Sequence, residues 1–256
     1  MKTVLITGAS AGIGKETAKV FAEKNYNLVL VARRKDALES LKNEILINNK
    51  VEIQIIDLDL SLINSAEKLY EITQNQNLKI DVLVNNAGFG LFDSFLLHDP
   101  HKLEQMLVLN MITLTKLSQL FGNKMVANGG GNIVNIASTA AFQPMPHLAV
   151  YAATKSYVMN FSDAIAYELK DKNIKVTCIN PGATNSEFAQ VANFTSSVIQ
   201  DNKIPSSRDL AVFIYDVMKQ GKTNTTHGLK NSIMAWSNRF VPRTLSTKIA
   251  AKIVAS

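Results

Sequence analysis

The sequence predicts an α/β fold in which a doubly wound parallel sheet carries helices on both faces. Short apolar runs rich in β-branched residues alternate with helix-length segments along most of the chain. A glycine-rich turn joins the first such run to the first helical segment. The length, 256 residues, suits one domain with a sizeable core. We therefore expect residues 1–256 to form a single nucleotide-binding domain.

The expected strands are short and apolar on both faces, as in a buried parallel sheet. They lie at Thr3–Thr7, Asn27–Ala32, Val51–Ile56, Ile80–Val84, Asn132–Ile136 and Lys175–Ile179. The helix-length segments between them are Gly12–Lys24, Asp36–Asn48, Ser61–Asn75, Pro100–Asn128 and Val150–Lys170. This alternation favours right-handed crossovers between parallel strands.

The first connection reads Thr7-Gly8-Ala9-Ser10-Ala11-Gly12-Ile13-Gly14. Glycines at a strand-to-helix turn let a phosphate approach the backbone, and the free N–H groups of the helix start favour an anion. The spacing G-x-x-x-G-x-G differs from the usual dinucleotide fingerprint, and Gly14-Lys15-Glu16 does not fit a P-loop. The alternative is a tight turn that uses glycine only for positive φ. We expect this turn to hold the pyrophosphate of a dinucleotide.

Two arginines, Arg33 and Arg34, follow the second expected strand. In a sheet that binds NAD, an acidic residue about 20 positions past the glycines holds the ribose 2′-hydroxyl. A guanidinium at that place can instead bind a 2′-phosphate through charge-assisted hydrogen bonds. The sequence therefore predicts NADP(H) as the cofactor, and the alternative is that both arginines are solvated loop charges.

Tyr151 and Lys155 are four residues apart in an expected helix and so project from one face of it. A phenol has a pKa near 10, and a neighbouring ammonium lowers that pKa and suits the phenol to proton transfer. Ser138, which follows the fifth expected strand, could hydrogen-bond the reacting oxygen.

These residues together resemble the short-chain dehydrogenase/reductase family, whose domain is Rossmann-like. The resemblance runs from Thr3 to about Phe188. It covers the glycine turn, the Asn85–Gly88 element, the Pro181-Gly182 element and the four residues of the catalytic tetrad. The tetrad residues are Asn110, Ser138, Tyr151 and Lys155.

The resemblance implies an oxidoreductase that transfers hydride between the nicotinamide and a carbonyl or secondary alcohol. Tyr151 would be the acid/base, Lys155 would lower its pKa and bind the nicotinamide ribose, and Ser138 would polarise the substrate oxygen. Asn110 would hold a water that links Lys155 to solvent. The implied cofactor contacts are Gly8, Ser10, Gly12, Ile13, Gly14, Arg33, Arg34, Asp59, Leu60, Asn86, Ala87, Gly88, Tyr151, Lys155, Pro181, Gly182, Thr184 and Ser186. Asp59 would contact the adenine, with Asp57 as the alternative.

The composition limits which kinds of partner, compartment and metal site we expect. The 27 basic and 21 acidic residues give a net charge of +6, and their scatter shows no nucleic-acid arm. One cysteine, Cys178, cannot form an internal disulfide, which indicates a reducing, cytoplasmic compartment and an inert core thiol. No apolar run is long enough to span a membrane, and no signal peptide is apparent. The four histidines lack ligand spacing, so we expect no catalytic metal.

Two segments fall outside the alternating pattern. Residues 182–207 are expected to form a substrate loop or lid. Residues 232–256 hold the only tryptophan and several basic residues, and they are expected to form a capping or dimer-contact segment. Peripheral membrane contact, with a lipid or acyl-carrier substrate, is the alternative for this tail.

The expected partner is a small carbonyl or alcohol substrate, apolar or aromatic rather than a sugar, because the candidate specificity segments are rich in phenylalanine. The family resemblance implies a homodimer or homotetramer, through the helices at Pro100–Asn128 and Val150–Lys170. A different class of function, an NADPH-binding sensor or scaffold, is possible on the same fold. The complete tetrad favours the enzyme.

Overall fold

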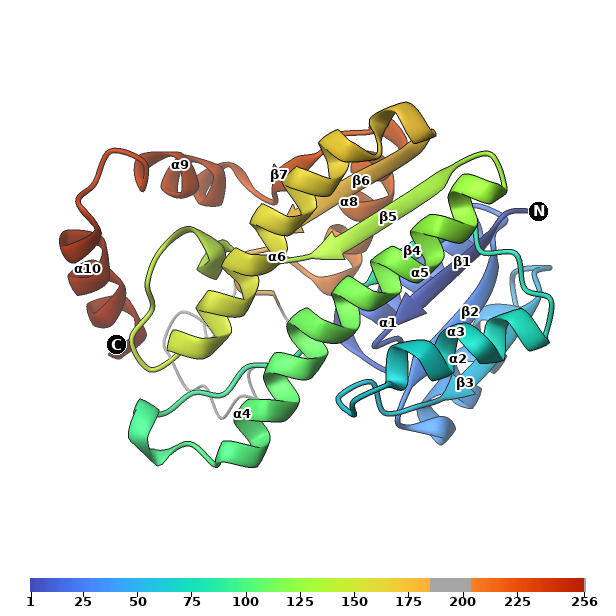
Figure 1. Cartoon of the computed structure of the whole chain (residues 1–256), viewed down its shortest axis with the longest axis horizontal. Coiled ribbons are helices and arrows are strands. Elements are labelled where there is room, and N and C mark those ends of the chain that lie inside the picture. The colour runs from blue at the N-terminus through green and yellow to red at the C-terminus, as the bar shows by residue number, and fades with distance from the viewer. Residues whose placement is uncertain (185–203, 256) are drawn as a thin grey trace.

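The computed structural model describes residues 1–184 and 204–255. Among these residues, seven strands form one parallel sheet in the order β3-β2-β1-β4-β5-β6-β7 (Figure 1). The strands are β1 (Thr3–Thr7), β2 (Asn27–Ala32), β3 (Ile53–Asp57), β4 (Val82–Asn85), β5 (Gly131–Ile136), β6 (Ile174–Asn180) and β7 (Asn224–Thr226). The helices are α1 (Gly12–Glu23), α2 (Lys35–Leu46), α3 (Ser65–Asn75), α4 (Pro100–Leu107), α5 (Leu114–Ala127), α6 (Ala149–Glu168), α8 (Ser207–Gln220), α9 (Leu229–Ser237) and α10 (Arg243–Ala255).

The helices cover both faces of the sheet. Val4 and Ile6 of β1 pack into one cluster with residues of α1, α2 and α8. Leu5, between them, faces a second cluster formed with α3 and α5. Successive strand residues point to opposite faces, so both faces of β1 must be apolar to be covered. The predicted single, doubly wound Rossmann-like domain is confirmed.

The order of the strands reverses direction at β1. Strands β2 and β3 are added in order on one side of β1. The chain then crosses over, and β4 pairs with the other side of β1. In sheets of this kind a ligand binds outside the carboxyl ends of the strands at such a switch point. Thr7 and Asn85, at the ends of β1 and β4, border this position.

The helix expected over Pro100–Asn128 is interrupted. A π-helical segment, Val108–Thr113, separates α4 from α5, and it contains Asn110. Single π-helical turns inside longer helices are frequent at functional sites. The helix expected from Ser61 begins instead at Ser65, because Asn64 adopts a left-handed conformation with φ of 66°.

The structure adds two elements that the sequence analysis does not predict. Helix α8 begins after Ser206, whose hydroxyl accepts a hydrogen bond from the Asp209 amide at 3.0 Å. It packs beside α1 on the sheet face that contains Val4. Strand β7 is three residues long and polar, so it lacks the apolar run on which strand prediction depends.

Candidate active site

The predicted site residues lie at the carboxyl ends of the strands. The glycine turn follows β1, Arg33 follows β2, and Asn85 closes β4. Ser138 lies two residues past β5, and Pro181 directly follows β6. Parallel strands present their carboxyl ends at one edge of a sheet, so the fold brings these segments to a common crevice.

The glycine turn is shaped for close approach of backbone and ligand. Gly8 has φ of +68°, a conformation that side chains disfavour, and an added Cβ would lie 2.9 Å from the Cα of Ala87. A Cβ on Gly14 would overlap the carbonyl oxygen of Gly8. Helix α1 then begins at Gly12 with no capping side chain and no acidic residue in its first turn. These features fit the pyrophosphate of a dinucleotide, because free helix N–H groups favour an anion.

Thr7 ties the glycine turn to the end of β4. Its hydroxyl oxygen accepts hydrogen bonds from the amides of Asn86 and Ala87, each at 3.0 Å. The Asn86 side chain donates in return to the carbonyls of Thr7 at 2.9 Å and Gly8 at 3.2 Å. Thr7 is not among the predicted site residues, and its place in the T-G motif was the signal for it.

The two arginines lie beside the same turn. Arg34 donates to the Ser10 hydroxyl at 3.3 Å, which brings its guanidinium to the glycine loop. Arg33 lies 3.9 Å from a carboxylate oxygen of Asp59, with 71% of its side chain exposed. The other Asp59 oxygen accepts from the Ser61 amide at 2.9 Å. An exposed guanidinium held by one long ion pair is available to a 2′-phosphate.

Asp57 and Asp59, the two candidates for the adenine contact, differ in their surroundings. Asp57 closes β3 and is exposed, and its backbone pairs with Ala32 at the end of β2. Asp59 is oriented by Ser61 and approaches Arg33. Leu60 is 4% exposed, and its carbonyl accepts from the hydroxyl of Thr113 at 2.9 Å. Of the two carboxylates, Asp59 is the one that lies beside Arg33, and its contact with the adenine stays a prediction.

Tyr151 and Lys155 lie one turn apart on α6, and both are buried. The Lys155 ammonium donates to the carbonyl of Ile136 at 2.8 Å and lies 5.7 Å from the centre of the Tyr151 ring. Ser138 caps the short helix that follows β5, accepting from the Ala140 amide at 3.1 Å. The predicted grouping of a phenol, an ammonium and a hydroxyl is therefore present at the end of β5.

Burial is the largest influence on the pKa values of Tyr151 and Lys155. It raises the pKa of Tyr151 to about 12, against the opposing effect of a hydrogen bond with Ser138. It lowers the pKa of Lys155 to about 8. From the sequence, the Lys155 ammonium is expected to lower the pKa of Tyr151. In the structure the pKa of Tyr151 is raised instead, because loss of solvation is the largest effect on the phenol.

Asn110 projects from the π-helical segment into the same region. Its amide nitrogen donates to the carbonyl of Phe89 at 3.0 Å and to the hydroxyl of Thr154 at 3.1 Å. Its oxygen accepts from the Phe89 amide at 3.2 Å, and a Cβ on Gly88 would lie 3.0 Å from that oxygen. Thr154, which the sequence analysis did not single out, therefore joins Asn110 to the helix that carries Tyr151 and Lys155.

The segment after β6 contacts the segment that carries Ser138. The carbonyl of Pro181 accepts from the Thr139 amide at 2.8 Å, which joins this segment to the one that carries Ser138. The Thr184 hydroxyl donates to the carbonyl of Gly182 at 3.1 Å. Ser186 and most of the expected lid at 182–207 lie outside the described residues.

An apolar cluster surrounds Tyr151. Its buried members are Met106, Ala140, Leu148, Tyr151 and Ala152, and partly buried side chains such as Phe89, Leu91, Phe92 and Met145 pack against them. His147 is exposed, has φ of 63° and lies with its ring 5.6 Å from that of Phe92. The cluster gives the phenol a predominantly apolar border.

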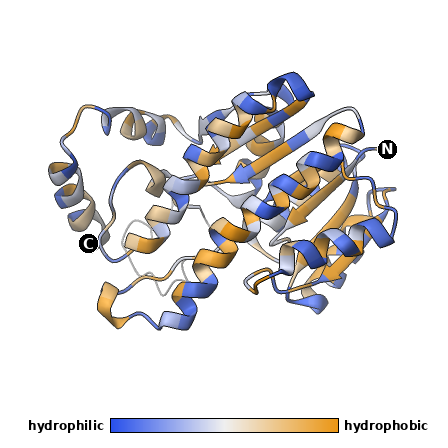
Figure 2. Cartoon of the chain, in the orientation of Figure 1, coloured by the Kyte–Doolittle hydropathy of each residue, from blue (hydrophilic) through white to orange (hydrophobic). Residues whose placement is uncertain are grey.

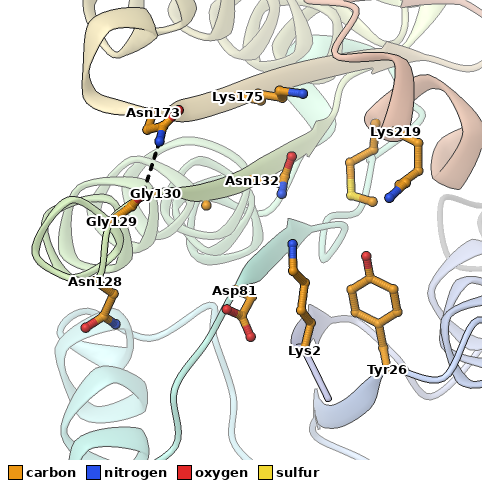
Figure 3. Close-up of a pocket in the computed structure, with 12 residues that line it drawn as sticks. Lys2, Tyr26, Asp81, Asn128, Gly129, Gly130, Asn132, Asn173, Lys175 and Lys219 are labelled. Atoms are coloured by element: carbon orange, nitrogen blue, oxygen red, sulfur yellow. Dashed lines mark hydrogen bonds between the residues drawn. The ribbon is translucent and has the colours of Figure 1, made fainter.

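A cavity of about 300 Å³ lies at the other edge of the sheet (Figure 3). Its lining includes Lys2, Tyr26, Asp81 and Asn132 at the amino ends of strands, and Lys219 near the end of α8. None of the predicted site residues lines it, so this cavity is separate from the crevice described above.

Within the part of the chain that the structure describes, no three His, Cys, Asp or Glu side chains gather as metal ligands. Cys178 is fully buried, and burial raises its pKa to about 12. The described helices include none with the length and apolar character needed to cross a bilayer.

Comparison with known proteins gives consistent results. The family model described as short chain dehydrogenase matches residues 2–196. The very-long-chain 3-oxoacyl-CoA reductase of Mus musculus is 30% identical over 251 residues, which cover 96% of this chain and 77% of that protein.

Two solved structures are similar over most of their length. A short-chain dehydrogenase from Sphingobium yanoikuyae in complex with NADPH has a TM-score of 0.83 and 29% identity, covering 94% of each chain. The bulky-bulky ketone specific alcohol dehydrogenase from Comamonas testosteroni has a TM-score of 0.79 and 28% identity, covering 94% of this chain and 92% of that one. The match of the family model over residues 2–196, together with the 30% identical relative, shows that the chain belongs to the short chain dehydrogenase family.

Proposed function

We propose that this protein is an NADP(H)-dependent oxidoreductase that reduces the carbonyl group of an apolar or aromatic compound, or oxidises the corresponding secondary alcohol. Family membership makes it an oxidoreductase of C=O and CH–OH groups, and an NADPH-bound relative supports NADP(H) as its cofactor. The observation that carries the proposal is the buried group of Tyr151, Ser138 and Lys155 beside the glycine turn. When bound, NADPH supplies the hydride that reaches the carbonyl carbon.

The residues of the chain divide the binding of the cofactor among them. The first turn of α1 and the glycine turn would hold the pyrophosphate. Arg33, with Arg34 beside it, would bind the 2′-phosphate, since both guanidinium groups lie at the end of β2. Lys155 would hydrogen-bond the nicotinamide ribose while it donates to the Ile136 carbonyl.

Tyr151 would donate the proton to the substrate oxygen. Its raised pKa keeps the phenol protonated at neutral pH, which suits the reduction direction. Ser138 would donate a second hydrogen bond to that oxygen and polarise the carbonyl. In the oxidation direction the phenol must first lose its proton, so the rate of oxidation should rise with pH into the alkaline range while the rate of reduction changes little.

The substrate class follows from the border of the site. Phe89, Leu91, Phe92 and Met145 pack against the cluster that contains Tyr151, so a bound carbonyl compound would meet mainly apolar surface. The names of two relatives, a very-long-chain 3-oxoacyl-CoA reductase and a bulky-bulky ketone specific alcohol dehydrogenase, agree with such a substrate.

Assembly and location are part of the proposal. Exposed apolar residues on the α5–α6 side, Ile112 at 45% and Tyr157 at 39%, support a homodimer or homotetramer formed through these helices. The single, buried thiol of Cys178 suits a reducing compartment such as the cytoplasm.

Replacement of the proposed acid tests the mechanism. We expect Tyr151→Phe to lower kcat/KM for an apolar ketone by about 10²- to 10⁴-fold and to leave the Kd of NADPH within about twofold. Tyr157→Phe is a matched control, because Tyr157 lies on the same helix and its hydroxyl, among the described residues, hydrogen-bonds Thr115 at 2.8 Å. Comparable turnover by Tyr151→Phe and Tyr157→Phe would refute the assignment of Tyr151 as the acid.

A further inference from the structure

The net positive charge of the chain is concentrated in one segment. Of the 27 basic and 21 acidic residues, residues 221–256 hold six basic residues and no acidic one, so residues 1–220 hold 21 of each. The six are Lys222, Lys230, Arg239, Arg243, Lys248 and Lys252. All six are exposed, and none forms an ion pair with another described residue. Residues 1–220 therefore have no net charge, and residues 221–256 have a net charge of +6.

The same segment exposes large apolar side chains at helical spacing. Leu229, Ile233 and Trp236 lie on one face of α9 and are 78%, 58% and 62% exposed. Phe240 follows in the turn after α9, 70% exposed, with its ring 4.8 Å from that of Trp236. An aromatic pair beside unpaired basic residues is typical of segments that lie at a lipid interface.

Helix α10 repeats the pattern. Leu245 and Ile249 are 49% and 47% exposed, and Lys248 and Lys252 lie on the same side of the helix at spacings of three and four residues. Two successive helices thus present apolar and basic side chains together. We refer to the exposed residues of α9, α10 and the turn between them as the basic apolar surface.

The basic apolar surface is joined to the active-site loops. Asn238, just past α9, donates to the Gln143 side chain at 3.0 Å, and Ser246 of α10 donates to Asn238 at 2.8 Å. Gln143 lies between Ser138 and Tyr151 in the sequence. Along the long axis of the molecule, α9 and α10 lie at the same end as the start of α6, which carries Tyr151 (Figure 1).

A second exposed apolar segment lies at this end. Phe95, Leu96 and Leu97, in the connection between β4 and α4, are 60%, 87% and 71% exposed. Figure 2 shows this turn as a hydrophobic stretch at the tip of the molecule below α10. The connection that carries it also provides Phe92 and Leu91 of the apolar cluster around Tyr151.

We propose that the basic apolar surface docks the protein on an anionic lipid bilayer. Basic side chains are drawn to the negative surface of the membrane, and exposed aromatic and aliphatic side chains enter the interface beside them. A symmetric contact with a second copy is disfavoured, because a self-complementary interface would set this uncompensated positive charge against itself. The proposal goes beyond the proposed reaction, since vesicle binding requires neither cofactor nor turnover.

The single tryptophan provides a direct readout. The purified full-length protein is mixed with vesicles of phosphatidylcholine and phosphatidylglycerol in equal amounts, or of phosphatidylcholine alone, and sedimented. We expect sedimentation with the anionic vesicles and a blue shift of the Trp236 emission as its 62% exposed ring leaves water. Both signals should weaken when the salt is raised from about 50 mM to about 500 mM, because the attraction is screened.

Two double variants test the basic and the aromatic residues of the basic apolar surface separately. We expect Arg239→Gln with Arg243→Gln to lower the partition coefficient by about 25-fold, about fivefold for each charge removed. Trp236→Ala with Phe240→Ala should lower it at least as strongly, by sedimentation. The control is Tyr167→Ala with Lys170→Gln, since Tyr167 is exposed in the last turn of α6, Lys170 is exposed two residues past its end, and neither should alter binding.

The outcomes are distinct. Absence of sedimentation with anionic vesicles at low salt would overturn the proposal, as would equal loss in the control. A blue shift that grows with protein concentration without vesicles would also overturn it, because a second copy would then cover Trp236. Titration of the same samples with NADPH reports the cofactor site separately, so failure of vesicle binding and failure of the proposed function are distinguishable.

Discussion

Lys155→Met is expected to change the stability of the protein in a pH-dependent way. Burial lowers the pKa of Lys155 to about 8 from the usual lysine value of 10.5. The folded state therefore holds this proton less tightly than the unfolded chain does. Between pH 8 and pH 10.5 the unfolded state binds more protons, so this group makes the folded state more stable as pH rises and less stable as pH falls through 8.

The magnitude follows from the difference between the two pKa values. At pH 7 the buried ammonium disfavours folding by about 3 kcal/mol, and at pH 9.5 by about 1 kcal/mol. The wild type should therefore gain about 2 kcal/mol relative to Lys155→Met between these pH values. The difference between the two proteins cancels the opposing contributions of Tyr151 and Cys178, whose pKa values are raised.

Urea unfolding at pH 7 and pH 9.5 measures this difference. The loss of the hydrogen bond to the Ile136 carbonyl lowers the stability of Lys155→Met equally at both pH values, so it does not affect the comparison. Lys170→Met is the control, because Lys170 is exposed. An identical free-energy difference between wild type and Lys155→Met at the two pH values would show that the ammonium is not desolvated.

Two further substitutions test the cofactor crevice. Arg33→Asp should lower the ratio of kcat/KM with NADPH to kcat/KM with NADH by about 10- to 100-fold, the loss expected when a charged hydrogen bond to phosphate is removed. An unchanged ratio, equal to that of Lys170→Asp, would assign the 2′-phosphate to another group. Gly14→Ala places a Cβ against the Gly8 carbonyl, so it should destabilise folding by about 1–3 kcal/mol and weaken NADPH binding. Urea unfolding and an NADPH titration measure both effects, and no change in either would show that the turn has room for a side chain.

The sequence was sufficient for the central part of the fold because the strands there are apolar and bounded by turn residues. β1 and β2 have the predicted bounds, Thr3–Thr7 and Asn27–Ala32. β7 could not be predicted, since its three polar residues are strand only through pairing with β6. The break in the long helix at Asn110 could not be predicted either, because it depends on tertiary hydrogen bonds to Phe89 and Thr154.

The proximity of the predicted residues could be inferred from the sequence, whereas their pKa values could not. Tyr151 and Lys155 meet because helical spacing fixes which side chains share a face. Their pKa values depend on burial, which comes from side chains distant in sequence, such as Met106. The spacing of Tyr151 and Lys155 shows that a charge lies near the phenol but not how far the phenol is desolvated, so the direction of its pKa shift could not be predicted from the sequence.

A row of buried side-chain hydrogen bonds explains how the site is held in place. Asn85 and Asn135 are directly paired at the ends of β4 and β5, and the Asn85 amide donates to the Asn135 oxygen at 2.9 Å. The same amide group donates to Ser118 of α5 at 3.1 Å, and the Asn135 amide donates to Ser162 of α6 at 2.9 Å.

These hydrogen bonds join β4 and β5 to each other and to α5 and α6, which pack on them. Asn135 is followed by Ile136, whose carbonyl accepts from Lys155. Buried amides are costly unless their partners are in place, so this row specifies one register of strands and helices. That register determines where the carbonyl of Ile136 meets the ammonium of Lys155. The position of the proposed catalytic lysine therefore depends on polar contacts in the core as well as on its own helix.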